Sequence, residues 1–222
     1  MGKLKNWWFI HGAGRTGTTY MLNLFNSNAA KFASDPGLAR VLHQAELVIG
    51  LDVDRYLADL SDNMHENAKN GWGRQIDLVY KQANSSVQEY RYLVSMFGPP
   101  ARSLFCMRAP GGFMASAMKK FDAKEGHLRY NYIKSFELYA ETGGDILHYG
   151  PHLTRENVQS YMEAIDFPRN AITSERLNTF RYTGTEDESR VSPEMHTAYR
   201  KCIAEASEKS DTFSELAYLA VT

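Results

Sequence analysis

The stretch that decides the fold of this chain runs from residue 9 to residue 19 and reads Phe9-Ile10-His11-Gly12-Ala13-Gly14-Arg15-Thr16-Gly17-Thr18-Thr19. The apolar residues 7–11 predict a strand that stops at Gly12, and residues 18 to about 26 predict a helix with one apolar face. A strand that passes through a glycine-rich turn into a helix directs backbone N–H groups and the positive end of the helix dipole to one place. The stretch therefore predicts an anion-binding loop.

This loop differs from the nucleotide triphosphatase pattern G-x-x-x-x-G-K-[ST] at one position. Gly12, Gly17 and Thr19 fit the pattern, but Thr18 occupies the place of the lysine. The cation lies three residues earlier, at Arg15. A glycine-rich turn that holds no ligand is the alternative, but strand, turn, cation and helix coincide here, which favours an anionic ligand.

A second segment that could contribute to a ligand site begins about ninety residues later. Residues 103–107 form a continuous apolar run that predicts a buried strand, and Arg108 follows it directly. An arginine at the end of a parallel strand lies at the carboxyl edge of the sheet, where ligands bind in doubly wound folds. Ser116, two turns into the next helix, returns to the same edge. A surface ion pair for Arg108 and a packing role for Ser116 are the alternatives.

The two segments together resemble the sulfotransferase family. Its 5′-phosphosulfate loop reads Arg or Lys, then Ser or Thr, then Gly-Thr-Thr, and residues 15–19 match it at every position. Its 3′-phosphate site is a strand that ends in Arg-x-Pro with a serine eight positions after the arginine, as Arg108 and Ser116 have it here. The chain departs from the family at Ala109 and Gly112, where aspartate is usual.

The resemblance implies transfer of a sulfuryl group from 3′-phosphoadenosine 5′-phosphosulfate (PAPS) to a hydroxyl or amine acceptor, without a metal ion. The implied cofactor contacts come from the loop, from the second segment and from a later polar segment; they are Gly14, Arg15, Thr16, Gly17, Thr18, Thr19, Arg108, Ser116 and Arg181. Arg190 is a further, weaker candidate. A less specific similarity over residues 147–168 retains Tyr149, Leu153 and Phe167.

Two cations are the candidates for stabilising the reaction. Arg15 is expected to stabilise the negative charge that builds on the bridging and sulfuryl oxygens. Lys81, after a strand predicted at Ile76–Tyr80, is similar to a family lysine near the sulfuryl group. A surface lysine is the alternative for this position.

The general base is expected at Asp35, which stands where one branch of the family has a carboxylate. The alternative is that Asp35 caps a helix before Pro36. His43 and Glu46, on the next predicted helix, are the other candidates.

The remaining elements alternate between helices and strands. Helices are predicted over 38–49 and 56–64. Four more helices are predicted to begin at a capping box at Ser85-x-x-Gln88, at Gly112, after a cap at Thr154 and at Ser192-Pro193, and a strand is predicted over 145–149. This alternation predicts an α/β fold with a parallel sheet covered on both faces. We expect a single three-layer domain over residues 1–222, of the P-loop sulfotransferase type that the resemblance implies.

Composition narrows the function classes. The net charge of −1 gives no case for a nucleic-acid or membrane-surface partner. Two cysteines, Cys106 and Cys202, do not make a disulfide framework, and no targeting signal is visible, so we expect a cytoplasmic enzyme.

Two other functions are compatible with the pattern. One is a nucleoside or small-molecule kinase that uses ATP, and the other is a nucleotide-binding protein that has lost its acceptor chemistry. Two features count against the kinase. The loop cation is displaced to Arg15, and the strand over residues 103–107 is followed by Arg108, where a kinase of this type would have a metal-binding aspartate. The acceptor is expected to be a small molecule or a carbohydrate. Aromatic residues that could line its pocket, or serve packing instead, are Trp72, Tyr130, Tyr132 and Tyr139.

Overall fold

A computed structural model of the chain describes residues 7–25, 50, 78–150, 153, 155–164 and 184–208. Several predictions lie outside these residues and stay predictions. They are the helices over 38–49 and 56–64, the cap at Thr154, and the side chains of Asp35, His43, Glu46, Trp72, Phe167 and Arg181.

The described residues contain one sheet of four parallel strands in the order β2-β1-β3-β4. The strands are β1 (Trp7–Gly12), β2 (Leu78–Ala83), β3 (Arg102–Met107) and β4 (Asp145–His148). The chain leaves β1 toward one side for β2 and then crosses to the other side for β3. The carboxyl ends of β1 and β3 therefore flank the point where the strand order reverses, which is where doubly wound sheets bind ligands.

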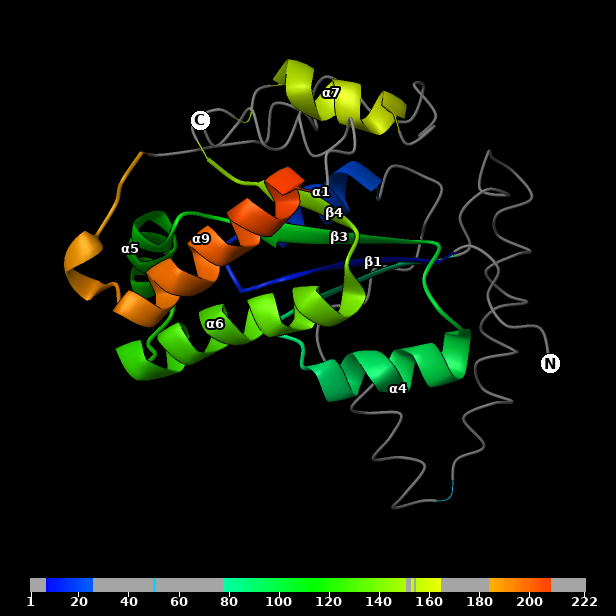
Figure 1. Ribbon diagram of the computed structural model, residues 1–222, viewed down its shortest axis with the longest axis horizontal. Helices are drawn as coiled ribbons and strands as arrows, with labels where there is room; N and C mark the ends of the chain where they lie inside the picture. The colour runs from blue at the N-terminus through cyan, green and yellow to red at the C-terminus, as the bar shows by residue number, and fades with distance from the viewer. Residues whose placement is uncertain are drawn as a thin grey trace.

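Helices cover both faces of this sheet, which confirms the predicted α/β fold (Figure 1). On one face lie α1 (Thr18–Phe25) and α7 (Arg155–Ala164), and on the other lie α4 (Val87–Phe97) and α6 (Glu125–Thr142), with α9 (Pro193–Glu208) beside α6. Helix α5 (Pro110–Lys120) follows β3 at the carboxyl edge and contacts the 3₁₀ turn η2 (Glu188–Arg190).

The core between the sheet and the α4–α6 face is mostly aromatic. The ring of Phe105 stacks on Tyr139 with centroids 4.9 Å apart, and Phe9 stacks on Tyr90 at 5.4 Å. His11 lies between Phe9 and Phe105, at centroid distances of 5.0 and 5.2 Å. Each such ring contributes about 1.5–3 kcal/mol when it is fully buried, so this layer fixes the strands that carry the site.

His11 is buried in this aromatic layer, and its Nε2 lies 3.0 Å from Oγ1 of Thr142. Burial lowers the pKa of the imidazole to about 3. His11 is therefore neutral in the folded protein, and its place within the core gives it a structural role.

Several predicted boundaries need correction. The capping box of α4 is formed by Ser86 and Glu89, one residue later than predicted, because the Ser86 hydroxyl accepts the Glu89 N–H at 3.1 Å while the Glu89 carboxylate accepts the Ser86 N–H at 2.8 Å. Strand β2 ends at Ala83, three residues beyond the predicted end. Helix α5 begins at Pro110 rather than Gly112.

The longest described helix, α6, was not predicted at all. Of the three tyrosines of α6 that were proposed for an acceptor pocket, Tyr132 and Tyr139 are buried in the core and Tyr130 is exposed. Two of the tyrosines proposed for an acceptor pocket thus serve packing.

Cys106 and Cys202 are both buried thiols, and they are not joined to each other in a disulfide. Among the described residues, no helix combines the length and the apolar character that crossing a bilayer requires.

Candidate functional site

The backbone of the predicted loop turns sharply between β1 and α1. Gly12 and Gly17 have φ angles of 149° and 101°, and Arg15 has a φ of 79°, which places an L residue in the left-handed region. Such a conformation costs about 1–3 kcal/mol at a non-glycine residue and persists only where the surroundings impose it. At Gly12 a side chain is excluded outright, because a Cβ would lie 2.3 Å from the carbonyl oxygen of Cys106.

This turn leaves a group of backbone N–H donors available. Within the described part of the chain, the amides of Arg15, Gly17, Thr18 and Thr19 have no hydrogen-bond acceptor, since the first bond of α1 runs from Met21 N to Gly17 O. Four such amides at the start of a helix form a concave donor site for an anion.

Two other loop groups are already engaged. The Gly14 N–H donates to Oδ1 of Asn84 at 2.9 Å, and the Thr16 hydroxyl donates to the carbonyl oxygen of Ala13 at 2.7 Å. Asn84 follows β2 with a φ of 58°, and its own N–H donates to Gly12 O at 2.9 Å. These bonds hold the loop in shape, so Gly14 and Thr16 act on the loop geometry in this structure, and a ligand contact from either stays a prediction.

The side chain of Arg15 joins the two predicted halves of the site. Its Nε donates to Oγ of Ser116 at 3.3 Å, although the two residues are 101 positions apart. Arg15 comes from the loop after β1 and Ser116 from α5, which follows β3. The structure thus brings the loop cation and the predicted phosphate serine into direct contact at the reversal point of the sheet.

Arg108 lies at the end of β3 and is 5% exposed. Its guanidinium carbon stands 5.7 Å from the centre of the Tyr149 ring, and the hydroxyl of Tyr132 donates to the Arg108 carbonyl oxygen at 2.6 Å. On its other side lies Gly112 of α5, where a Cβ would come within 2.8 Å of the Arg108 Nε. The glycine in place of the usual aspartate therefore makes room for the arginine side chain.

Tyr149 is a site residue that the predicted set of contacts did not include. Its ring lies against Gly17, where a Cβ would meet Cδ2 of the ring at 2.5 Å, and it packs edge-on to Tyr20 with centroids 6.3 Å apart. Its N–H donates to Met107 O at 2.7 Å, which holds it beside the end of β3. Its position at the end of a parallel strand was the signal that would have identified it.

Lys81 is placed differently from its prediction. It lies inside β2 rather than after it, opposite Ile10, and is 4% exposed. Burial raises the pKa of the neighbouring Cys106 thiol, and the Lys81 charge opposes that rise. Whether Lys81 contributes to catalysis stays a prediction.

Arg190 is engaged in ion pairs near the start of α5 and α6. Its guanidinium contacts the carboxylates of Glu125 and, at 2.9 Å, Asp187. In the same turn, the Glu188 carboxylate lies against Gly111 and 3.2 Å from Nε2 of His196. These contacts fasten η2 onto α5 and α6, so Arg190 has a structural role in the described state.

Comparisons with known proteins fit this architecture. No description of a protein family matches the sequence, and no curated protein matches it. Among solved structures, the chain is similar to the sulfotransferase domain of the olefin synthase from Synechococcus PCC 7002, with a TM-score of 0.53 and 14% identity over 89% of this chain and 84% of that chain. The fold is similar to that of a sulfotransferase domain.

A second similarity is to a sugar kinase from Janibacter sp. HTCC2649 in an unliganded structure. The TM-score is 0.44 and the identity is 15%, over 76% of this chain and 98% of that chain. At 14% identity the first similarity concerns the fold alone, and the second, with a TM-score below 0.5, carries no argument.

Proposed function

We propose that this protein is a sulfotransferase that moves a sulfuryl group from PAPS to an acceptor hydroxyl. The observation that carries the proposal is the 3.3 Å contact between Arg15 and Ser116. The sequence placed these residues in two separate phosphate-binding motifs, and a nucleotide with phosphates at both its 5′ and 3′ positions needs both motifs at one edge of the sheet.

The described residues fit this donor. The four available amides at the loop and the first turn of α1 would hold the 5′-phosphosulfate, with the Arg15 cation beside it. Arg108 and Ser116, after β3 and on α5, would hold the 3′-phosphate. Tyr149 lies between Gly17 and Arg108, so it would set the spacing of the two anion sites.

The proposed reaction is an in-line displacement at sulfur. A new bond forms between the acceptor oxygen and sulfur, and the bond between sulfur and the bridging phosphate oxygen breaks. The electron pair of that bond leaves with 3′-phosphoadenosine 5′-phosphate, and the acceptor proton passes to a base. Arg15 would stabilise the charge that grows on the leaving oxygen.

The experiment that tests the proposal is a calorimetric titration with three nucleotides in the absence of added metal. We expect 3′-phosphoadenosine 5′-phosphate to bind far more tightly than AMP or ATP, because only it carries a 3′-phosphate for Arg108 and Ser116. Comparable affinity for ATP would refute the proposal and favour a kinase.

A matched pair of variants locates the effect. Ser116→Ala should weaken binding of 3′-phosphoadenosine 5′-phosphate about tenfold, whereas AMP binding should not weaken, because AMP no longer competes with Ser116 for Arg15. Ser95→Ala is the control and should change neither affinity, because Ser95 lies on the exposed surface of α4 and its hydroxyl donates to the Tyr92 carbonyl oxygen of the same helix.

A further inference from the structure

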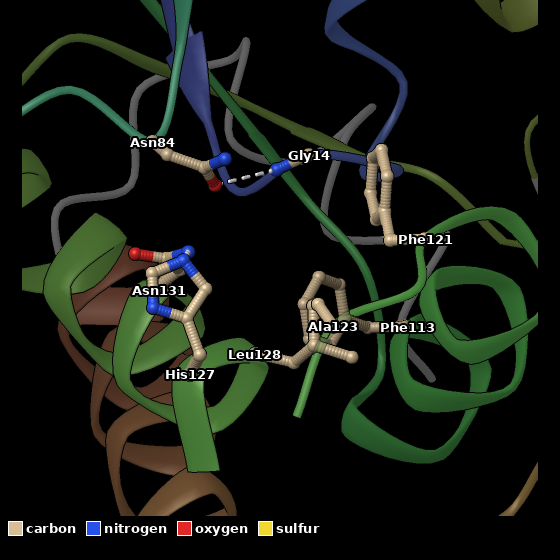
Figure 2. A pocket seen from close by; sticks show the side chains of 8 residues that line it. All are labelled: Gly14, Asn84, Phe113, Phe121, Ala123, His127, Leu128 and Asn131. Carbon is tan, nitrogen blue, oxygen red and sulfur yellow. Dashed lines mark hydrogen bonds between the residues drawn. The ribbon is translucent and has the colours of Figure 1, made fainter. Parts of the chain in front are cut away.

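A pocket of about 190 Å³ opens beside the phosphate loop, between that loop, the turn after α5 and the first half of α6 (Figure 2). Gly14 connects it to the loop directly. A Cβ on Gly14 would lie 3.4 Å from the Phe121 ring and 3.6 Å from Nδ2 of Asn84, so both side chains border the residue that precedes Arg15.

One wall of the pocket is polar and is formed by amide and imidazole side chains. Asn84 lies across from His127 and Asn131 in Figure 2, and these last two residues, one helical turn apart on α6, contact each other at 3.0 Å through Nε2 and Nδ2. Within the described part of the chain, this leaves Nδ1 of His127 and Oδ1 of Asn131 without hydrogen-bond partners. The wall thus offers hydrogen-bonding groups to a ligand.

The opposite wall is apolar and aromatic. Phe113, Phe121 and Leu128 form it, and Phe121 is 39% exposed although it is one of the largest apolar side chains. No Asp, Glu, Lys or Arg is among the described lining residues. A pocket below the roughly 300–1,000 Å³ typical of drug-sized ligands suits a single ring.

We propose that this pocket binds the sulfuryl acceptor, and that the acceptor is a small uncharged phenol. The ring would lie against Phe121 and Phe113, and the hydroxyl would bond to the His127–Asn131 pair. The proposal rests on the proposed function for its chemistry, since it places the acceptor one residue from Arg15. It assigns a ligand to residues of α6 that the sequence did not identify as a site.

The test is an NMR titration of the ¹⁵N-labelled chain with phenol, glucose and 4-hydroxybenzoate. Phenol should shift the amides of Gly14, Phe121 and Leu128 and bind at least tenfold more tightly than the other two. Glucose has hydroxyls but no aromatic ring, and 4-hydroxybenzoate adds a carboxylate to a pocket whose described lining contains no Lys or Arg.

Two variants assign the binding to this pocket. Ala123→Phe fills the cavity from the turn before α6 and should abolish the phenol-induced shifts, whereas Ala140→Phe, at an exposed position of the same helix, should not. Asn131→Ala should weaken phenol binding about tenfold through one lost hydrogen bond. A purely structural role of this pair on the helix would change stability slightly and leave phenol affinity unchanged.

The outcomes separate this inference from the proposed function. Phenol that binds equally well to Ala123→Phe, or no better than glucose or 4-hydroxybenzoate, overturns the pocket assignment even if 3′-phosphoadenosine 5′-phosphate binds as expected. Phenol that binds in the pocket of a chain with no preference for that nucleotide leaves the pocket as a phenol site and overturns the sulfotransferase function. Transfer of radiolabelled sulfate from PAPS to phenol, lost in Ala123→Phe, supports both.

Discussion

Gly112→Ala is the substitution that most directly tests the position of Arg108. A Cβ at residue 112 would lie 2.8 Å from the Arg108 Nε, and side-chain carbons essentially never approach another atom that closely. Arg108 has little space to withdraw, because it is 5% exposed and the Tyr149 ring lies 5.7 Å from the guanidinium carbon. The guanidinium must therefore leave the position in which we expect it to meet a 3′-phosphate.

The size of the effect follows from this geometry. The Cβ would stand about 0.6 Å inside the 3.4 Å at which ordinary contact begins. A shift of that size breaks one hydrogen bond of a charged pair, which is worth about 1.5–3 kcal/mol, or roughly a 10- to 150-fold loss of affinity. Alanine meanwhile favours the helix over glycine by up to about 1 kcal/mol. Affinity and helix propensity thus change in opposite directions.

The assay compares calorimetric affinity for 3′-phosphoadenosine 5′-phosphate with urea unfolding of the same samples. Gly126→Ala is the matched control, because Gly126 lies in the first turn of α6 with nothing within 4 Å of its Cβ position. The control should gain stability and bind the nucleotide normally. Wild-type affinity in Gly112→Ala would refute the placement of Arg108 at the 3′-phosphate.

Two further predictions concern the loop and the core. Arg15→Ala should lower the rate of sulfuryl transfer more than it lowers affinity for 3′-phosphoadenosine 5′-phosphate. Arg108→Ala should weaken that affinity by roughly 2–4 kcal/mol. Small, equal effects of both substitutions on rate and affinity would show that neither arginine contacts the donor. Because the pKa of His11 is about 3 when folded and 6.5 when unfolded, its contribution to stability is complete above pH 6.5 and is lost by about 1.4 kcal/mol per pH unit as the pH falls from 6.5 toward 3. His11→Phe keeps the ring stack and should flatten that slope in urea unfolding between pH 6.5 and pH 5, and an unchanged slope would mean that His11 already ionises in the folded state.

The sequence predicted the turn after β1 and the strand before Arg108 better than it predicted the helices around them. The loop and the Arg108 strand could be identified because each is a local pattern, a turn or a strand end, whose chemistry depends on residues close in sequence. Helix α6 escaped prediction although Leu128, Tyr132, Phe136 and Tyr139 lie at helical spacing within one buried cluster. Tyrosines occur on both its buried and its exposed side, so the contrast between apolar and polar positions is weak in the sequence.

Contacts between residues that are far apart in the sequence could not be predicted from local patterns either. The packing of Tyr149 against Gly17 depends on the order of the strands, which the spacing of residues in the sequence does not reveal. Gly112 stands where the resemblance led us to expect an aspartate, and its closeness to the Arg108 side chain gives the glycine a steric reason.

The contact between Arg15 and Ser116 explains why ligand preference, more than affinity for any one nucleotide, reports on this site. Arg15 keeps a left-handed backbone and an outward cation while it is hydrogen-bonded to a serine of the second motif. A ligand with a single 5′-phosphate can occupy the loop amides but must then compete with Ser116 for Arg15 and gains nothing from Arg108. A ligand with both phosphates can replace the Arg15–Ser116 bond with two stronger charge-assisted contacts, one for each residue. The free energy that separates the two ligands therefore measures the coupling of the two motifs, and it should vanish when Ser116 and Arg108 are both replaced by alanine.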